Sequence, residues 1–104
     1  MKEIEFYKLE NGKEPVRDWL LSLDNTTRVK IIKRLERIYD DNFGDFKQLA
    51  PNLYELRFSF GRGYRIYYTI KNNIIVLLLS AGNKQRQDKD IEIAKEYLKT
   101  LGDK

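Results

Sequence analysis

Apolar and charged residues alternate near the N-terminus, and the spacing then becomes helical. Ile4 and Phe6 alternate with charged neighbours, which predicts a first strand over residues 3–8. An Asn-Gly pair typical of a turn follows, and Pro15 suits the first turn of a helix. The apolar residues of that helix recur three and four positions apart, and we expect them to face the core: Val16, Trp19, Leu20 and Leu23.

A second helix is predicted to follow directly, because Asp24 or Asn25 can cap its N-terminus. Asn42 and Gly44 are predicted to end it. Four apolar residues at helical spacing form its expected inward face: Val29, Ile32, Leu35 and Tyr39. Basic residues form much of the opposite face, which is typical of a solvated surface: Lys30, Lys33, Arg34 and Arg37.

The second half of the chain predicts three strands and a last helix. The strands are expected near Leu53–Phe60, Tyr64–Lys71 and Ile74–Ser80, and the helix from about Asp88 to Leu101. Its inward residues are expected to be Ile91, Ala94, Leu98 and Leu101. The order β-α-α-β-β-β-α predicts a single α+β domain over residues 1–104, with helices packed on one face of an antiparallel sheet.

The alternation along the two central strands also predicts their pairing. Their apolar rows share one face only if Gly61-Arg62-Gly63 is a three-residue loop, which pairs Arg57 with Tyr67. Arg57 and Arg65 then become diagonal neighbours, about 7–8 Å apart. A two-residue turn at Asn72-Asn73 places Ser80 opposite Arg65. One face of the sheet is therefore expected to carry a polar set: Glu55, Arg57, Ser59, Arg65, Tyr67 and Ser80.

This polar face is well suited to a phosphate-bearing partner. Two guanidiniums at that spacing can contact one phosphate, or two adjacent ones, with paired hydrogen bonds. Lys84, Arg86 and Gln87 lie in the loop that leaves the same end of the sheet, although Gln87 can instead cap the last helix. Tyr67, on the arginine face, could stack on a base.

Composition narrows the chemistry further. The chain has 104 residues, a net charge of +4, no cysteine and no histidine, so disulfides and thiolate or imidazole metal sites are excluded. The acidic residues are scattered singly, and we predict no metal and no cofactor. The N-terminus has no apolar signal-peptide region, and the longest apolar run, Ile74–Leu79, is too short to span a bilayer. We therefore expect a cytoplasmic protein without a membrane partner.

Three segments of the second half carry a resemblance to a known family: LYELR at 53–57, GRGYRIYY at 61–68 and GNKQRQDKDI at 82–91. The chain resembles RelE/ParE-superfamily toxins, in the branch of HigB-like addiction module killer proteins, over nearly its whole length. The resemblance implies a RelE-like fold and a bacterial type II toxin that a helix-turn-helix antitoxin neutralises. Relatives of the RelE and HigB kind cut messenger RNA in the ribosomal A site, whereas ParE-like relatives inhibit DNA gyrase.

The resemblance also implies roles for particular residues. Arg57 and Arg65 match strand arginines that hold the scissile phosphate in ribonuclease members, Lys84 matches a basic loop residue, and Arg62 would reach the RNA backbone. Many such members carry a histidine or tyrosine acid/base near the C-terminus, and this chain has no histidine. The base could be Glu55, a lysine or tyrosine with a lowered pKa, or a ribosomal group.

Two readings of Glu55 remain open at this stage, since a carboxylate beside arginines can be a catalytic base or a salt-bridge partner. Three functions also remain open. The first is a metal-independent messenger RNA endoribonuclease that acts on the ribosome and stops translation. The others are a ParE-like inhibitor of DNA gyrase and a non-catalytic RNA-binding domain.

Overall fold

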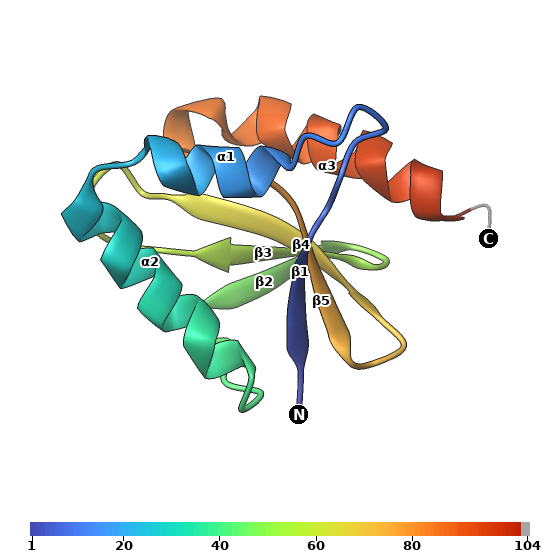
Figure 1. Ribbon diagram of the computed structural model, residues 1–104, viewed down its shortest axis with the longest axis horizontal. Coiled ribbons are helices and arrows are strands. Elements are labelled where there is room, and N and C mark those ends of the chain that lie inside the picture. Colours follow the sequence, from blue (N-terminus) through green and yellow to red (C-terminus); the bar gives the residue numbers. More distant parts are fainter. Residues whose placement is uncertain (103–104) are drawn as a thin grey trace.

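A computed structural model describes residues 1–102 and shows a five-stranded sheet with three helices packed against it (Figure 1). The elements, in chain order, are β1 (Glu3–Phe6), α1 (Pro15–Ser22), α2 (Asn25–Ile38), β2 (Phe46–Ala50), β3 (Leu53–Arg57), β4 (Arg65–Lys71), β5 (Ile75–Gly82), the 3-10 turn η1 (Lys84–Arg86) and α3 (Gln87–Gly102). The α+β class is confirmed. No helix within the described residues is long and apolar enough to cross a membrane.

The sheet is mixed, whereas an antiparallel sheet was expected. Its strand order is β1-β5-β4-β3-β2, and β1 runs parallel to β5 while the other neighbours are antiparallel. Strand β2 has no counterpart among the predicted elements. It is a short edge strand whose first three residues are exposed, so no apolar alternation marks it in the sequence.

Helices cover both faces of the sheet, which corrects the expectation of one covered face. The core under α1 and α2 includes Val16, Leu35 and Leu78, and a second core under α3 includes Leu79 and Ala94. The physical reason lies in β5, whose continuous apolar run leaves no polar face and is buried from both sides. The inward residues predicted for α3 do pack on this second core.

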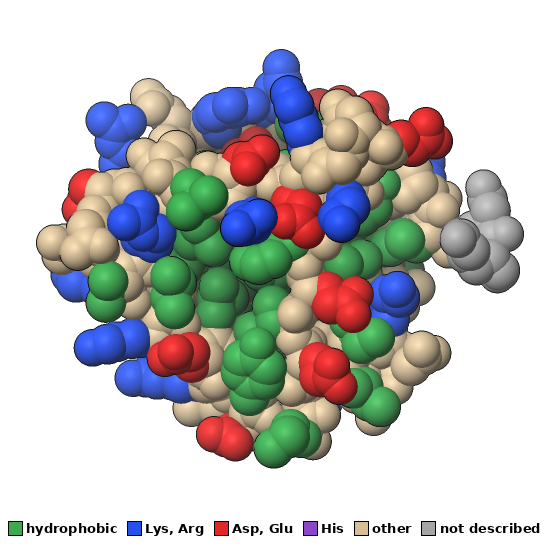
Figure 2. Space-filling model, viewed as in Figure 1, with side chains coloured by type: hydrophobic (Ala, Val, Ile, Leu, Met, Phe, Trp, Pro, Cys, Tyr) green, Lys and Arg blue, Asp and Glu red, His purple; other side chains and the backbone are tan. Residues whose placement is uncertain are grey.

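Helix α2 turns a different stripe toward the core than the pattern indicated. Its buried residues are Ile31, Leu35 and Ile38, whereas three of the four predicted core residues are exposed: Val29 by 40%, Ile32 by 39% and Tyr39 by 42%. The predicted N-cap is confirmed, since Asp24 Oδ2 accepts a hydrogen bond of 3.2 Å from the Thr27 amide. In Figure 2, hydrophobic side chains gather on the face that contains α2 and β1, with charged side chains around them.

The hairpin between β3 and β4 is shifted by two residues from the predicted register. Arg57 pairs directly with Arg65, and the Phe58 amide donates to the Tyr64 carbonyl at 3.0 Å, so the loop is longer than the predicted three residues. The aromatic rings beside the loop accompany the difference: Phe60, the partner predicted for Tyr64, lies in the loop, and the Tyr64 ring packs on Phe60 and Trp19. A shift of two residues keeps every side chain on its predicted face.

The hairpin between β4 and β5 also departs from the predicted register. Lys71 pairs with Ile75, and an irregularity between Tyr67 and Tyr68 brings Ser80 opposite Tyr67 and Gly82 opposite Arg65. The expectation that Ser80 faces Arg65 is therefore wrong by two residues, because the turn is one residue longer than predicted and the bulge adds one more. The turn does use the left-handed geometry expected of Asn72 and Asn73, whose φ angles are 53° and 60°.

Candidate functional site

Three predicted cations meet at one end of the sheet. Arg57 on β3, Arg65 on β4 and Lys84 in η1 line a shallow cleft of about 300 Å³. The remaining lining residues are Asp45, Phe58, Ser59 and Gly63. Cross-strand pairing places the two arginines side by side, and β5 delivers Lys84 to the same end because Gly82 is the partner of Arg65. The arrangement is an open, cationic surface of the kind that contacts phosphate.

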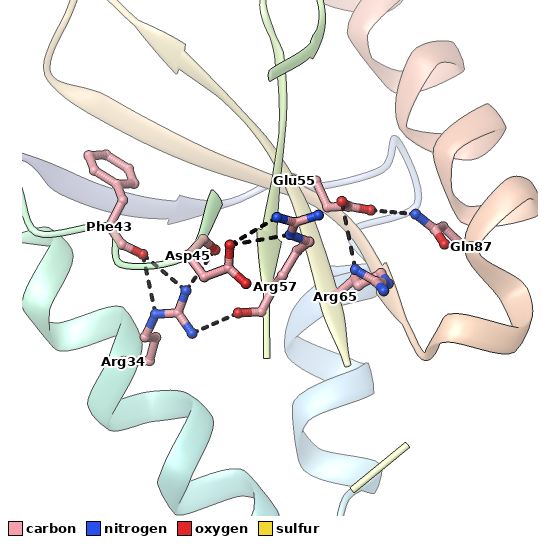
Figure 3. Close-up of polar contacts among 7 residues, drawn as sticks. All are labelled: Arg34, Phe43, Asp45, Glu55, Arg57, Arg65 and Gln87. Atoms are coloured by element: carbon pink, nitrogen blue, oxygen red, sulfur yellow. Dashed lines mark hydrogen bonds and ion pairs between the residues drawn. The ribbon is translucent and has the colours of Figure 1, made fainter. Parts of the chain in front are cut away.

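The two arginines have different carboxylate partners (Figure 3). Arg57 donates from Nη2 and Nε to Asp45 Oδ1 at 3.0 and 3.3 Å, and both side chains are well exposed, at 39% and 57%. Arg65 Nη1 lies 3.7 Å from Glu55 Oε1, and this pair is mostly buried, at 14% and 1%. Exposed ion pairs contribute little to stability and are readily exchanged for other partners. The Arg57 pair can therefore open to a ligand anion more easily than the Arg65 pair.

Glu55 is a buried salt-bridge partner, one of the two readings left open by the sequence. Its partner is Arg65 on the neighbouring strand β4. Its second oxygen, Oε2, accepts a hydrogen bond of 2.9 Å from Gln87 Nε2. Gln87 is the first residue of α3 and turns its side chain inward to this carboxylate (Figure 3).

Tyr67 is buried and is not among the residues that line the cleft. Its side chain is fully buried, and it belongs to the core under α3. This corrects the expectation that Tyr67 stacks on a base, because α3 covers the ring. Burial, with the nearby negative charge of Glu55, raises the pKa of the Tyr67 phenol, and burial also raises the pKa of Tyr97. Neither tyrosine is therefore the group with lowered pKa considered from the sequence.

The remaining predicted contacts lie around the cleft. Arg62 lies in the β3–β4 hairpin loop beside the cleft, where its carbonyl accepts a hydrogen bond of 3.4 Å from the Lys84 amide. A second hollow of about 390 Å³ is lined by Arg62, Asn83, Lys84 and Gln85. Arg86 is exposed and lies 3.7 Å from the buried Asp90 carboxylate. None of the ion pairs among residues 1–102 engages Lys84.

Asp45, which the sequence analysis did not identify, lies on the rim of the cleft, and Arg34 holds the segment that carries it. Arg34 donates to the carbonyls of Phe43, Asp45 and Arg57, with shortest distances of 3.1, 2.8 and 2.7 Å (Figure 3). This clamp joins α2 to the segment that presents the Asp45 carboxylate. Arg34 was assigned to the solvated face of α2. Arg34 lies three residues after the buried Ile31 and therefore on the same side of the helix. A correct assignment of the buried stripe would have placed Arg34 against the sheet and not in solvent.

Comparisons with known proteins show that the chain matches a recognised family over the residues that form the cleft. The family model described as "Phage derived protein Gp49-like (DUF891)" matches residues 18–99, which contain the whole cleft. A curated protein of Haemophilus influenzae, described as "Uncharacterized protein", is 42% identical over 85 residues, covering 81% of this chain and 86% of that protein.

Proposed function

Because the chain belongs to the phage-derived Gp49-like family, a RelE-like family of addiction-module toxins, we propose that it is a ribosome-dependent messenger RNA endoribonuclease. In this proposal it is the cytoplasmic toxin of a type II toxin–antitoxin system and belongs to the HigB-like branch. The family implies an antitoxin partner. We propose that this partner is a helix-turn-helix protein and that the toxin stops translation by cutting messages on the ribosome.

The observation that carries the proposal is the meeting of Arg57, Arg65 and Lys84 in one open cleft. Metal-independent RNA cleavage uses attack of a 2′-hydroxyl on the adjacent phosphate. It requires a base, an acid and cations around the pentacovalent transition state. The three side chains supply the cations, and the shallow shape admits a phosphate that remains part of a long RNA strand.

Each cation has its own part in the proposed reaction. Arg57 exchanges the exposed Asp45 carboxylate for the scissile phosphate, and Arg65 contributes charge from the floor of the cleft. Lys84, which has no ion-pair partner among the described residues, contacts the phosphate or acts in proton transfer. Arg62 and Arg86 follow the RNA backbone beyond the cleft. A ribosomal group takes the 2′-hydroxyl proton as the new bond to phosphorus forms, and the Lys84 ammonium or a ribosomal group gives a proton to the departing 5′-oxygen as its bond to phosphorus breaks.

One observation favours a protein-binding alternative. The exposed apolar stripe of α2 formed by Val29, Ile32 and Tyr39 suits a protein partner better than RNA. A ParE-like inhibitor of DNA gyrase would use such a surface, and it would arrest growth without cutting messages.

The decisive experiment maps messenger RNA ends by primer extension after the chain is induced in bacteria. Arg57→Glu and Lys84→Glu are the test variants, and Lys33→Glu on the exposed side of α2 is the matched control with the same charge change. We expect codon-phased cuts within translated regions for the wild type and the control, and none for the test variants. Growth arrest with intact messages would reject the ribonuclease and favour gyrase, and harmless expression would favour an RNA-binding domain.

A further inference from the structure

We infer that Glu55 is a positioning residue which holds the Arg65 guanidinium at the floor of the cleft, and that Gln87 holds Glu55 in place. The inference rests on the proposed function, since it concerns how the cleft is kept ready for a phosphate. It assigns to Glu55 a role other than base, and to Gln87 a role other than RNA contact.

Both oxygens of the Glu55 carboxylate are already engaged. Oε1 faces Arg65 Nη1 at 3.7 Å, and Oε2 accepts from Gln87 Nε2 at 2.9 Å. The side chain is 1% exposed, and burying a carboxylate is costly unless a cation and hydrogen-bond donors surround it. Arg65 and Gln87 provide these partners from β4 and from the first residue of α3 (Figure 3).

This geometry keeps Glu55 away from the reacting atoms. A general base has to come within about 2.6–3.2 Å of the hydroxyl whose proton it removes, directly or through one water. A buried carboxylate with one oxygen on Arg65 and the other on Gln87 has no side open to a ribose. Its charge instead acts through Arg65, which would otherwise be free to change rotamer.

The Asp45–Arg57 pair offers an internal contrast. Asp45 is 57% exposed on the rim of the cleft and lies 3.0 Å from Arg57, where it competes with a phosphate for that guanidinium. Glu55 cannot compete in this way because it lies behind Arg65, away from solvent. Removing the two carboxylates should therefore have opposite effects. Loss of Asp45 should strengthen phosphate contact, and loss of Glu55 should weaken it.

Gln87 connects the start of α3 to this arrangement. Its side-chain amide donates to Glu55 from the start of α3. The position of α3 against the sheet therefore affects the Arg65 side chain through one hydrogen bond and one ion pair. Gln87→Ala removes the hydrogen bond without touching either charged group. The variant should reproduce part of the effect of Glu55→Gln.

The first test measures order at the arginines in the free protein and does not depend on any activity. Nitrogen-15 NMR of the arginine Nε–Hε groups should show a rigid Arg65 side chain in the wild type. Its order should fall in Glu55→Gln and in Gln87→Ala, whereas the Arg57 signal keeps its wild-type order. An unchanged Arg65 signal in both variants would overturn the inference, even if the protein proved not to be a ribonuclease. If Glu55→Gln failed to fold, Gln87→Ala would still decide the point.

The second test uses ribosomes programmed with a defined message and follows the cleavage rate against pH. We expect Glu55→Gln to lower kcat by about 10- to 100-fold, the loss typical of a misplaced group, with an unchanged shape of the pH profile. Gln87→Ala should lower kcat less, and the double variant should lose little more than Glu55→Gln alone. Asp45→Asn is the matched control and should lower KM. Loss of one limb of the pH profile in Glu55→Gln would identify a general base and overturn the inference.

Discussion

Two neighbouring isoleucines on α2 offer the sharpest test of how the helix packs. Ile31 is fully buried in the core under α1 and α2, whereas Ile32 is 39% exposed. The apolar pattern of the sequence alone assigned Ile32, and not Ile31, to the inward face. Replacing each in turn by alanine therefore compares identical side chains, one residue apart, in two different environments.

The expected costs follow from burial. Isoleucine to alanine removes three carbons, and at about 0.8 kcal/mol for each buried methylene the transfer cost at Ile31 is about 2.4 kcal/mol. The closed cavity left behind adds to this, for an expected total of about 3–4 kcal/mol. At Ile32 part of the side chain is already in water, solvent fills the space, and alanine has a better helix propensity by a few tenths of a kcal/mol. The expected cost there is about 1 kcal/mol or less.

Urea unfolding followed by far-UV circular dichroism and by Trp19 fluorescence measures both costs. The free energies of unfolding of the two variants should differ by at least about 2 kcal/mol, which in thermal unfolding corresponds to a gap of about 8–16 °C between their melting temperatures. The m-value should stay constant, so that the change in midpoint reports stability. Equal costs, or a larger cost at Ile32, would refute the packing described for α2.

Three further predictions concern the cleft and α3. Lys84→Ala should reduce the salt dependence of RNA binding, the slope of log K against log salt, by about one unit, and fluorescence anisotropy over a salt series would contradict this if the slope stayed constant. Gly82→Ala should destabilise the fold by about 1–3 kcal/mol, because a Cβ there would overlap the buried Asp90 carboxylate, and thermal unfolding checks this. Burial raises the pKa of Asp90, so its ionisation opposes folding above the folded-state pKa, and the penalty disappears as pH falls toward the ordinary value of 3.8. Asp90→Asn should therefore raise the free energy of unfolding more at pH 7 than at pH 4, and equal gains at both pH values would contradict the assignment.

Much of the site could be predicted from residue order because side-chain direction in a strand depends only on parity. Leu56 and Ile66 lie on one face and Arg57 and Arg65 on the other, as predicted, although the hairpin register differs by two residues. A shift by an even number preserves the faces, so the arginine cluster was predictable even with the wrong pairing. The last helix was also predictable from the sequence, because its apolar residues form a single stripe at helical spacing.

Long-range packing determined the rest. Helix α2 carries two apolar stripes, and the position of Ile31 in the core, with Arg34 bound to the loop carbonyls of Phe43 and Asp45, selects one of them. The parallel placement of β1 and the edge strand β2 depend on contacts between distant segments, which local periodicity does not encode. The choice of Arg65 as the partner of Glu55 is of this kind as well. This pairing depends on the register between β3 and β4 and on the position of α3. The sequence therefore placed Glu55, Arg57 and Arg65 on one face but did not determine which arginine pairs with Glu55.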